Sequence, residues 1–420
     1  MTTRPCPTKA IPRIFTGGWL LVASWAITQL ARAQPTHTTQ DWAQVAADFD
    51  QRDSLKDYLA RLRSALLALK DRPEQQQPLK LSAHVTAESR SGVRRLRIRS
   101  FQFLSDGARS VGEYNLGPGS WPTVVGVLGS AVAQDFLIQA ALKGIPLDEL
   151  EVVFTSRPGT APSRTGTRVT YPRNMAYTAY VVSSASDAEL EALRQTVERI
   201  SPVLNLVTES QAIEHGKLFY TQTSAKRESR TLEGLREFLA EKRAASQGAK
   251  PPEGRSRFEP SLARNAGEPP LRAHIKVEAG TGIRHIRTDD SNFQIIHDNP
   301  RFLAGHNLGP VAEEHILGVM ITCLTHIYEI QAASKQVVLD TLELEVEGTL
   351  LPRIGSSGAP PRYKDIRYSV HISSPESKER IEELQRAVEA TCPIYNMLKD
   401  AQEIKGAVVR GPYPEKTGKP

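Results

Sequence analysis

The sequence has little cysteine, few aromatic residues and no long apolar run beyond its N-terminal segment. Three cysteines in 420 residues are too few for a disulfide-rich scaffold. A membrane helix needs ~20 apolar residues, and after the N-terminus no run approaches that length. Hydrophobic residues make up 40% of the chain and charged residues 24%, which is typical of a globular protein with a sizeable core.

Acidic residues are missing from the first 40 positions, which have the pattern of a targeting segment. Basic residues precede an apolar stretch, Trp19–Ile27, and Ala31-Arg32-Ala33 then forms an A-x-A cleavage pattern. This order predicts a secretory signal peptide over residues 1–33, cleaved after Ala33, and hence a periplasmic or secreted protein. An uncleaved anchor and an organelle transit peptide are the alternatives.

The charge of the rest of the chain is nearly balanced. The full chain has a formal net charge of +6, but four of its basic residues lie in 1–33, and without them 49 basic residues face 47 acidic ones. This balance, with only 6% aromatic residues for base stacking, argues against a nucleic-acid partner. There is no phosphate loop, Ser-His-Asp arrangement or paired-carboxylate motif, and we expect no cofactor.

Two stretches of the chain follow one pattern. Asn115–Pro118 recurs 192 positions later as Asn307–Pro310, and Ile138–Ala141 recurs with the same offset as Ile330–Ala333. Further matches keep the same order along the chain: Gly92-x-Arg94 with Gly282-x-Arg284, and Ser201-Pro202 with Cys392-Pro393. An ordered run of matches predicts a tandem duplication.

The elements predicted within each copy favour an α+β fold. The copies span 54–220 and 273–410, and a helix with a Pro/Gly-rich linker joins them over 221–272. Periodicity predicts that each copy begins with a helix, one that starts at Ser54 and one from Thr231 to Ala245. It also predicts strands at 95–99 and 342–347 and helices at 311–335 and 375–390. Ser374 is the predicted N-cap of the helix at 375–390. Helices alternating with strands in this way favour packing on an antiparallel sheet.

The two cysteines of the second copy have several interpretations. Cys323 falls in the middle of a long apolar helix, where a free cysteine often only packs. Cys392 precedes Pro393 at the start of a helix, where backbone N–H groups favour a thiolate, although a plain N-cap such as Ser201 also suits that place. As a structural disulfide the pair would close a loop of about 69 residues, worth roughly 4 kcal/mol.

Several motifs together resemble the OsmC/Ohr family, over about 232–410 and more weakly over about 54–220. They are Asp298-x-Pro300, Gly305-x-Asn307-x-Gly309-Pro310, Glu313, Ile321-Thr-Cys323-Leu and Cys392-Pro-Ile-Tyr-Asn396. Family members form intertwined homodimers with sites at the subunit interface. The resemblance implies two tandem OsmC-like domains, with antiparallel sheets and long central helices, paired as an intramolecular pseudo-dimer.

The resemblance also implies a thiol-dependent peroxidase that reduces hydroperoxides, often organic ones. Cys323 matches the peroxidatic cysteine and Cys392 the resolving one. Glu313 matches the family glutamate and Arg284 the family arginine, with Arg287 as the alternative. A guanidinium within reach could lower the pKa of a thiol by roughly 1–3 units. The partners implied are a hydroperoxide substrate and a dithiol reductant, lipoyl-type or thioredoxin-like.

The first copy lacks the residues for this chemistry, with Ala131 at the position of Cys323 and Ser201 at that of Cys392. We expect it to act as a scaffold that lends Arg94 or Arg97 to the site. One geometric difficulty concerns Glu313. If 313–323 is one continuous helix, Glu313 and Cys323 lie ~15 Å apart along its axis and cannot touch.

Histidines cluster around the motifs of the second copy. His326 lies at i+3 from Cys323, so the two could hold zinc or copper, but we expect His326 to pack beside the thiol or modulate it, with no metal. His306 is expected to line the entrance. The alternative to an enzyme is a secreted ligand-binding or redox-sensing module with a structural Cys323–Cys392 disulfide.

Overall fold

The computed structural model describes residues 54–70, 78–89, 91–107, 113–162, 166, 168–224, 233–246, 269–289, 292–351 and 361–414. These residues belong to one compact unit. The predicted signal peptide and most of the Pro/Gly-rich connection after position 246 lie outside the described residues.

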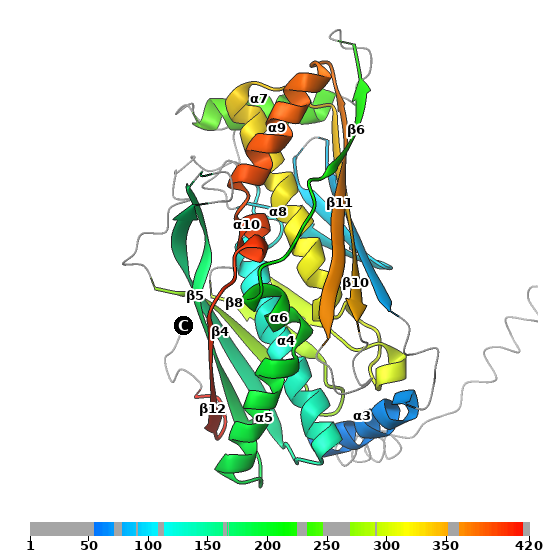
Figure 1. Cartoon of the computed structure of the whole chain (residues 1–420), viewed down its shortest axis with the longest axis vertical. Helices are drawn as coiled ribbons and strands as arrows, with labels where there is room; N and C mark the ends of the chain where they lie inside the picture. Colours follow the sequence, from blue (N-terminus) through cyan, green and yellow to red (C-terminus); the bar gives the residue numbers. More distant parts are fainter. Residues whose placement is uncertain are drawn as a thin grey trace, which may run out of the picture. The chain divides into compact units, whose positions relative to one another are not determined.

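The strands form two six-stranded sheets (Figure 1). The first has the order β3-β2-β1-β10-β11-β6, with β3 at Phe101–Ser105, β2 at Arg94–Ile98, β1 at Leu79–Ala87, β10 at Thr341–Leu351, β11 at Arg362–Ser374 and β6 at Lys217–Gln222. The second has the order β12-β5-β4-β7-β8-β9, with β12 at Ile404–Arg410, β5 at Arg168–Val182, β4 at Glu149–Pro162, β7 at Leu271–Val277, β8 at Arg284–Thr288 and β9 at Gln294–His297.

Each sheet combines strands of both sequence copies. In the first sheet β1 pairs antiparallel with β10, and in the second β4 pairs antiparallel with β7. Neighbouring strands are antiparallel except for β6 on β11 and β12 on β5, which are parallel. The α+β fold with intramolecular pairing of the two copies is thus confirmed, and neither copy completes a sheet alone.

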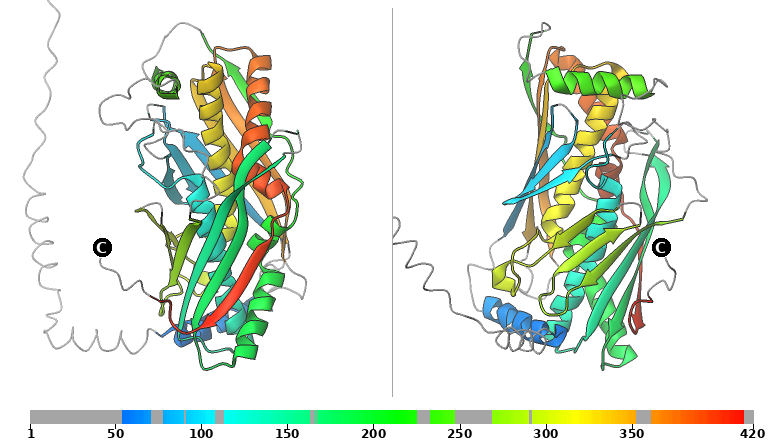
Figure 2. Two further views of the ribbon diagram at one scale, coloured as in Figure 1. Left: turned by 90° about the vertical axis from the view of Figure 1, so that its left-hand side faces the viewer. Right: turned by 180° about the vertical axis from the view of Figure 1, so that it is seen from behind.

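Two 24-residue helices, α4 at Ser120–Lys143 and α8 at Ala312–Lys335, form the centre of the fold. They contact each other, and each packs on strands of the opposite copy, α4 on β7 and β8 and α8 on β1 and β2 (Figure 2). Contrary to the sequence expectation, both are long and apolar enough to cross a membrane. The most apolar windows are 94% and 78% buried within the unit, as expected of core helices.

Shorter helices surround this centre, and most follow the sequence prediction. They are α3 at Leu55–Lys70, α5 at Asp187–Ile200, α6 at Pro202–Thr208, α7 at Glu233–Ser246, the 3-10 turn η3 at Arg301–Leu303, α9 at Lys378–Thr391 and α10 at Pro393–Lys399. The predicted cap at Ser374 is wrong. Its hydroxyl donates to Val338 O at the end of β11, and Ser377 instead caps α9 by accepting the N–H of Arg380.

The repeated Asn-Leu-Gly-Pro motif makes the same turn in both copies. Asn115 and Asn307 have φ of 58° and 59°, a left-handed conformation that asparagine tolerates. A Cβ at Gly117 or Gly309 would lie 2.2 or 2.3 Å from a carbonyl oxygen of β3 or of the β9 edge. These turns lead into α4 and α8 and fix where each central helix begins.

Candidate functional site

Two buried thiols meet where the middle of α8 faces the start of α10. Cys323 is 5% exposed and Cys392 is fully buried, and both are free cysteines in the structure. The Cys392 thiol hydrogen-bonds to Cys323, and this bond is the main cause that lowers the pKa of Cys323. Burial and the neighbouring sulfur raise the pKa of Cys392 well above its usual value. Cys323 is therefore the group that ionises, and Cys392 supports it as a hydrogen-bond donor.

Further groups favour the Cys323 thiolate against the cost of its burial. The backbone N–H of Ile394, in the first turn of α10, points at Cys323 because Pro393 starts that helix next to the thiols. The Arg94 charge and the Ser120 hydroxyl lower the pKa of Cys323 further. Both residues belong to the first copy, on β2 and at the start of α4.

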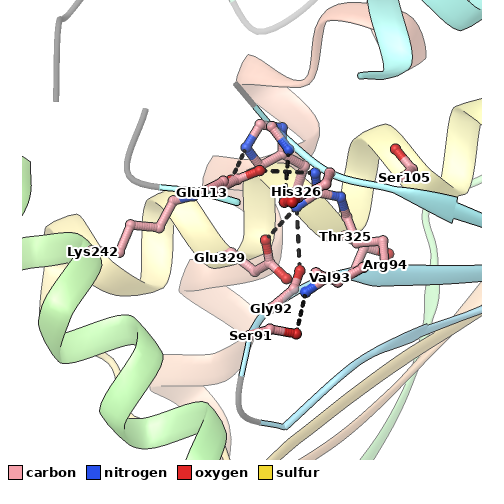
Figure 3. A network of polar contacts seen from close by, with 12 residues as sticks. Ser91, Gly92, Val93, Arg94, Ser105, Glu113, Lys242, Thr325, His326 and Glu329 are labelled. Carbon is pink, nitrogen blue, oxygen red and sulfur yellow. Dashed lines mark hydrogen bonds and ion pairs between the residues drawn. The ribbon is translucent and has the colours of Figure 1, made fainter. Parts of the chain in front are cut away.

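Arg94 is held at this place by two carboxylates (Figure 3). It is 1% exposed, and its guanidinium lies 3.0 Å from Glu113 Oε2 and 2.8 Å from Glu329 Oε2. Glu113 also contacts Lys242 of α7 and lies 2.7 Å from His326 Nε2. We call these five residues the Arg94 network. A buried arginine with fixed partners presents its charge in one orientation.

The two carboxyl groups that contact Arg94 have pKa values shifted in opposite directions. Burial would raise the pKa of Glu113, but Arg94, His326 and Lys242 hold it well below the usual range. Burial raises the pKa of Glu329 to about 8 and lowers that of His326 to about 4. Glu113 is thus the charged partner of Arg94, and the Arg94 charge lowers the pKa of the nearby Cys323 thiol.

Metal binding is a poor interpretation of this network. Ligand atoms of Glu113, His326 and Glu329 lie within 4.8 Å of one another. However, Arg94 and Lys242 already pair with these carboxylates, so a metal ion would meet two fixed positive charges. The His326 ring faces Glu113, which leaves no support for a Cys323–His326 metal pair.

A second polar region lies around Ala131, the counterpart of Cys323. Arg284 of β8 is fully buried, and its Nε donates to Ser130 Oγ at 3.2 Å. Burial lowers its pKa, opposed by charges that include Glu313 and Asp135. The Asp135 carboxyl hydrogen-bonds to the Ser201 hydroxyl, and burial raises its pKa well above its usual value.

The structure places Arg284 and Glu313 in this second region rather than beside the cysteines. Glu313 accepts a hydrogen bond from Gln134 Nε2 at 2.9 Å, and burial raises its pKa. Because α8 is continuous from 312 to 335, Glu313 and Cys323 are ~15 Å apart along its axis. The exchange of strands between copies brings Arg94, which the sequence held as an accessory, to the thiols.

The other predicted accessory residues lie apart from the thiols or act indirectly. Arg287 is exposed and bonds to Gln294, and His306 and Arg97 are exposed as well. His326 joins the Arg94 network. Sequence reasoning missed Glu113, because its counterpart 192 positions later is a glycine and the alignment of the copies carries no signal there.

A largely apolar pocket of about 240 Å³ lies among β3, the start of α4 and the first half of α8. Ser120, which interacts with Cys323, lines it together with Thr322. Most of its wall comes from apolar side chains of both copies: Leu96, Phe103, Leu104, Leu116, Phe293, Ile295 and Val319. His315 lines it two turns of α8 before Cys323.

Comparisons with known proteins find one family match and several solved structures. Residues 305–406 match the family model described as OsmC-like protein. No curated protein matches the chain. Among solved structures, an OsmC-like protein from Mycoplasma pneumoniae shares 22% identity over 31% of this chain and 89% of its own, with a TM-score of 0.25. An organic hydroperoxide resistance protein OsmC from Legionella pneumophila shares 18% over 30% and 88%, with a TM-score of 0.24.

Proposed function

We propose that this chain, a member of the OsmC-like family, is a thiol-dependent peroxidase that reduces organic hydroperoxides. One observation carries the proposal: Cys323, whose pKa is lowered, hydrogen-bonds to a second thiol and lies near the Arg94 charge. Ser120, which also interacts with Cys323, lines the apolar pocket. A packing cysteine needs neither a cation nor a thiol donor.

The chemistry begins with attack of the Cys323 thiolate on the terminal oxygen of the hydroperoxide. The O–O bond breaks, the alkoxide takes up a proton and leaves as an alcohol, and Cys323 becomes a sulfenic acid. The Cys392 thiol then displaces hydroxide from that sulfur, which gives a disulfide and water. An external dithiol of the lipoyl or thioredoxin-like kind reduces the disulfide and is itself oxidised.

Each part of the site has a role in this cycle. Arg94 stabilises the thiolate and the negative charge that develops on the leaving oxygen, in a place from which water is excluded. Glu113 and Glu329 orient Arg94. Cys392 already lies at hydrogen-bond distance from Cys323, so the disulfide needs little movement. The apolar pocket favours an organic substrate over hydrogen peroxide.

Location and reductant belong to the same proposal. The predicted signal peptide over 1–33 would export the protein to the periplasm or beyond, where the dithiol reductant would have to be supplied in that compartment.

Hydroperoxide consumption by residues 34–420 with a dithiol reductant tests the proposal, with cumene hydroperoxide and hydrogen peroxide as substrates. Cys323→Ser should abolish turnover. Cys392→Ser should complete one attack and then stall or over-oxidise. Turnover that survives Cys323→Ser would refute the site. No turnover, together with a disulfide that resists reductant, would favour the binding or redox-sensing module instead.

A further inference from the structure

A hydrogen-bonded chain connects the second polar region to the pocket of the first. Arg284 Nε bonds to Ser130 Oγ at 3.2 Å, and Ser130 Oγ lies 2.9 Å from His297 Nδ1. His297 Nε2 in turn lies 2.8 Å from His315 Nδ1. The His315 ring stacks on Phe103, and both side chains line the pocket.

The chemistry of its first member fixes the direction of this chain. A guanidinium only donates, so Ser130 Oγ accepts from Arg284. Among the described contacts, His297 Nδ1 is the acceptor within reach of the Ser130 hydroxyl proton, so Ser130 donates to it. His297 then carries its proton on Nε2 and donates it to His315 Nδ1. His315, accepting at Nδ1, keeps its proton on Nε2.

Both histidines are neutral, as this direction requires. Burial lowers the pKa of His297 well below its usual value, and burial lowers that of His315 to about 3. His315, which lines the pocket, therefore has an uncharged ring whose proton position is set by His297.

Three neighbouring hydroxyls differ from His315 in that their protons are already used, and Ser120 interacts with Cys323. The hydroxyls of Thr123, Thr322 and Ser105 donate to backbone carbonyls of Gly119, Gly318 and Pro118. Gln102 is exposed at the rim. Within the described pocket wall, His315 is thus the buried side chain with an oriented N–H.

We infer that His315 determines specificity, donating from Nε2 to a neutral oxygen acceptor, such as a ketone, in the body of the hydroperoxide. This inference rests on the proposed peroxidase function. His315 and Cys323 are eight residues apart on α8, about 12 Å along the axis. A substrate that meets both residues needs several carbon atoms between its hydroperoxide group and its ketone.

A matched pair of substrates tests this role: an alkyl hydroperoxide, and its analogue in which a methylene at the far end is a ketone. The chain should prefer the ketone roughly 5- to 10-fold in kcat/KM, mainly through KM, the value of one neutral hydrogen bond. His315→Phe keeps the stacking on Phe103 and should bring the preference to about one. His371→Phe, at a ring that stacks on Phe219 away from the pocket, is the matched control and should keep it.

Nitrogen NMR of the His315 ring gives a readout that a structural role would not move. The proton should reside on Nε2, and His297→Gln should disturb that tautomer. An alkyl methyl ketone without a peroxide group should shift the Nε2 resonance in the Cys323→Ser chain. A ketone that binds the His315→Phe chain equally well, or a proton found on Nδ1, would overturn the inference. Ketone binding through His315 without turnover of any hydroperoxide would refute only the proposed reaction.

Discussion

The two buried arginines occupy equivalent places in the fold and have opposite electrostatic surroundings. Arg94 contacts two carboxylates directly, and although burial lowers its pKa, Glu113 and Glu329 raise it above the usual value. Arg284 has a neutral serine hydroxyl as its direct side-chain partner, and burial lowers its pKa. One arginine is thus kept as a charge beside a thiol. Arg284 donates to a hydrogen-bonded chain in the region where Ala131 stands at the position that matches Cys323.

The comparison shows that a region without a cysteine can still gather buried polar groups. Around Ala131, the buried carboxyls of Asp135 and Glu313 have raised pKa values, which favours their neutral forms. The polar groups that remain bond to one another and reach His315 in the neighbouring pocket. The degenerate region then supports the other site's pocket instead of repeating its chemistry.

The largest expected difference between the regions is in thiol reactivity. Arg94→Gln should lower kcat/KM for a hydroperoxide by about 100-fold or more and raise the pKa of Cys323 by roughly 1–3 units, because the thiolate loses its cation. Alkylation rates measured against pH give that pKa directly.

Arg284→Gln is the matched control, and it should leave the alkylation profile of Cys323 unchanged. Arg94→Lys keeps the charge and guards against a folding defect, since it should recover part of the activity. If the two glutamine variants shifted the pKa of Cys323 equally, the assignment of Arg94 to the thiols would be refuted.

The sequence could predict the fold more fully than the site. Helical spacing and the repeated turn located α8 and the start of α10, since these depend on local patterns. Whether Arg94 or Arg284 reaches the thiols depends on which copy supplies the strands on which α8 packs. The pairing of β1 with β10 decides that choice, and local residues carry no information about it.

The pH dependence of folding should report on the hydrogen-bonded chain that ends at His315 in the pocket wall. The pKa of His315 is about 6.5 in the unfolded chain and about 3 when folded. Between these values only the unfolded state binds the proton, so stability falls as pH falls through this window. The expected loss is about 1.4 kcal/mol per pH unit from this group between about pH 6 and 4.

Denaturant titrations of the chain and of His315→Phe at several pH values would measure this slope. The variant should lose stability less steeply on acidification, by up to about 1.4 kcal/mol per unit. His371→Phe is the control, because it removes an imidazole that does not line the pocket. Equal slopes for the chain and His315→Phe would mean that His315 is not held neutral, which would also weaken its assignment as a fixed donor.

The smallest expected effect on stability concerns the residues that start α6 and α10. The Ser201 hydroxyl accepts the N–H of Leu204 and bonds to Asp135, whereas the Cys392 thiol meets the N–H groups of Ile394 and Tyr395 only as a weak sulfur acceptor. Ser201→Ala should therefore cost about 1–2 kcal/mol of unfolding free energy and leave peroxide turnover intact. Cys392→Ser should stay within about 1 kcal/mol of the parent chain, because a serine there can accept the N–H of Tyr395, yet turnover should stall.

Thermal unfolding and single-turnover assays on the two variants make this contrast quantitative. A stability loss for Cys392→Ser larger than that for Ser201→Ala would show that the second thiol is mainly a packing group. A stall without a stability loss would show instead that the two positions share a backbone geometry but have different roles. Ser201 would cap a helix, and Cys392 would resolve a sulfenic acid. The cysteine at position 392 would then be needed for the reaction and not for the start of α10.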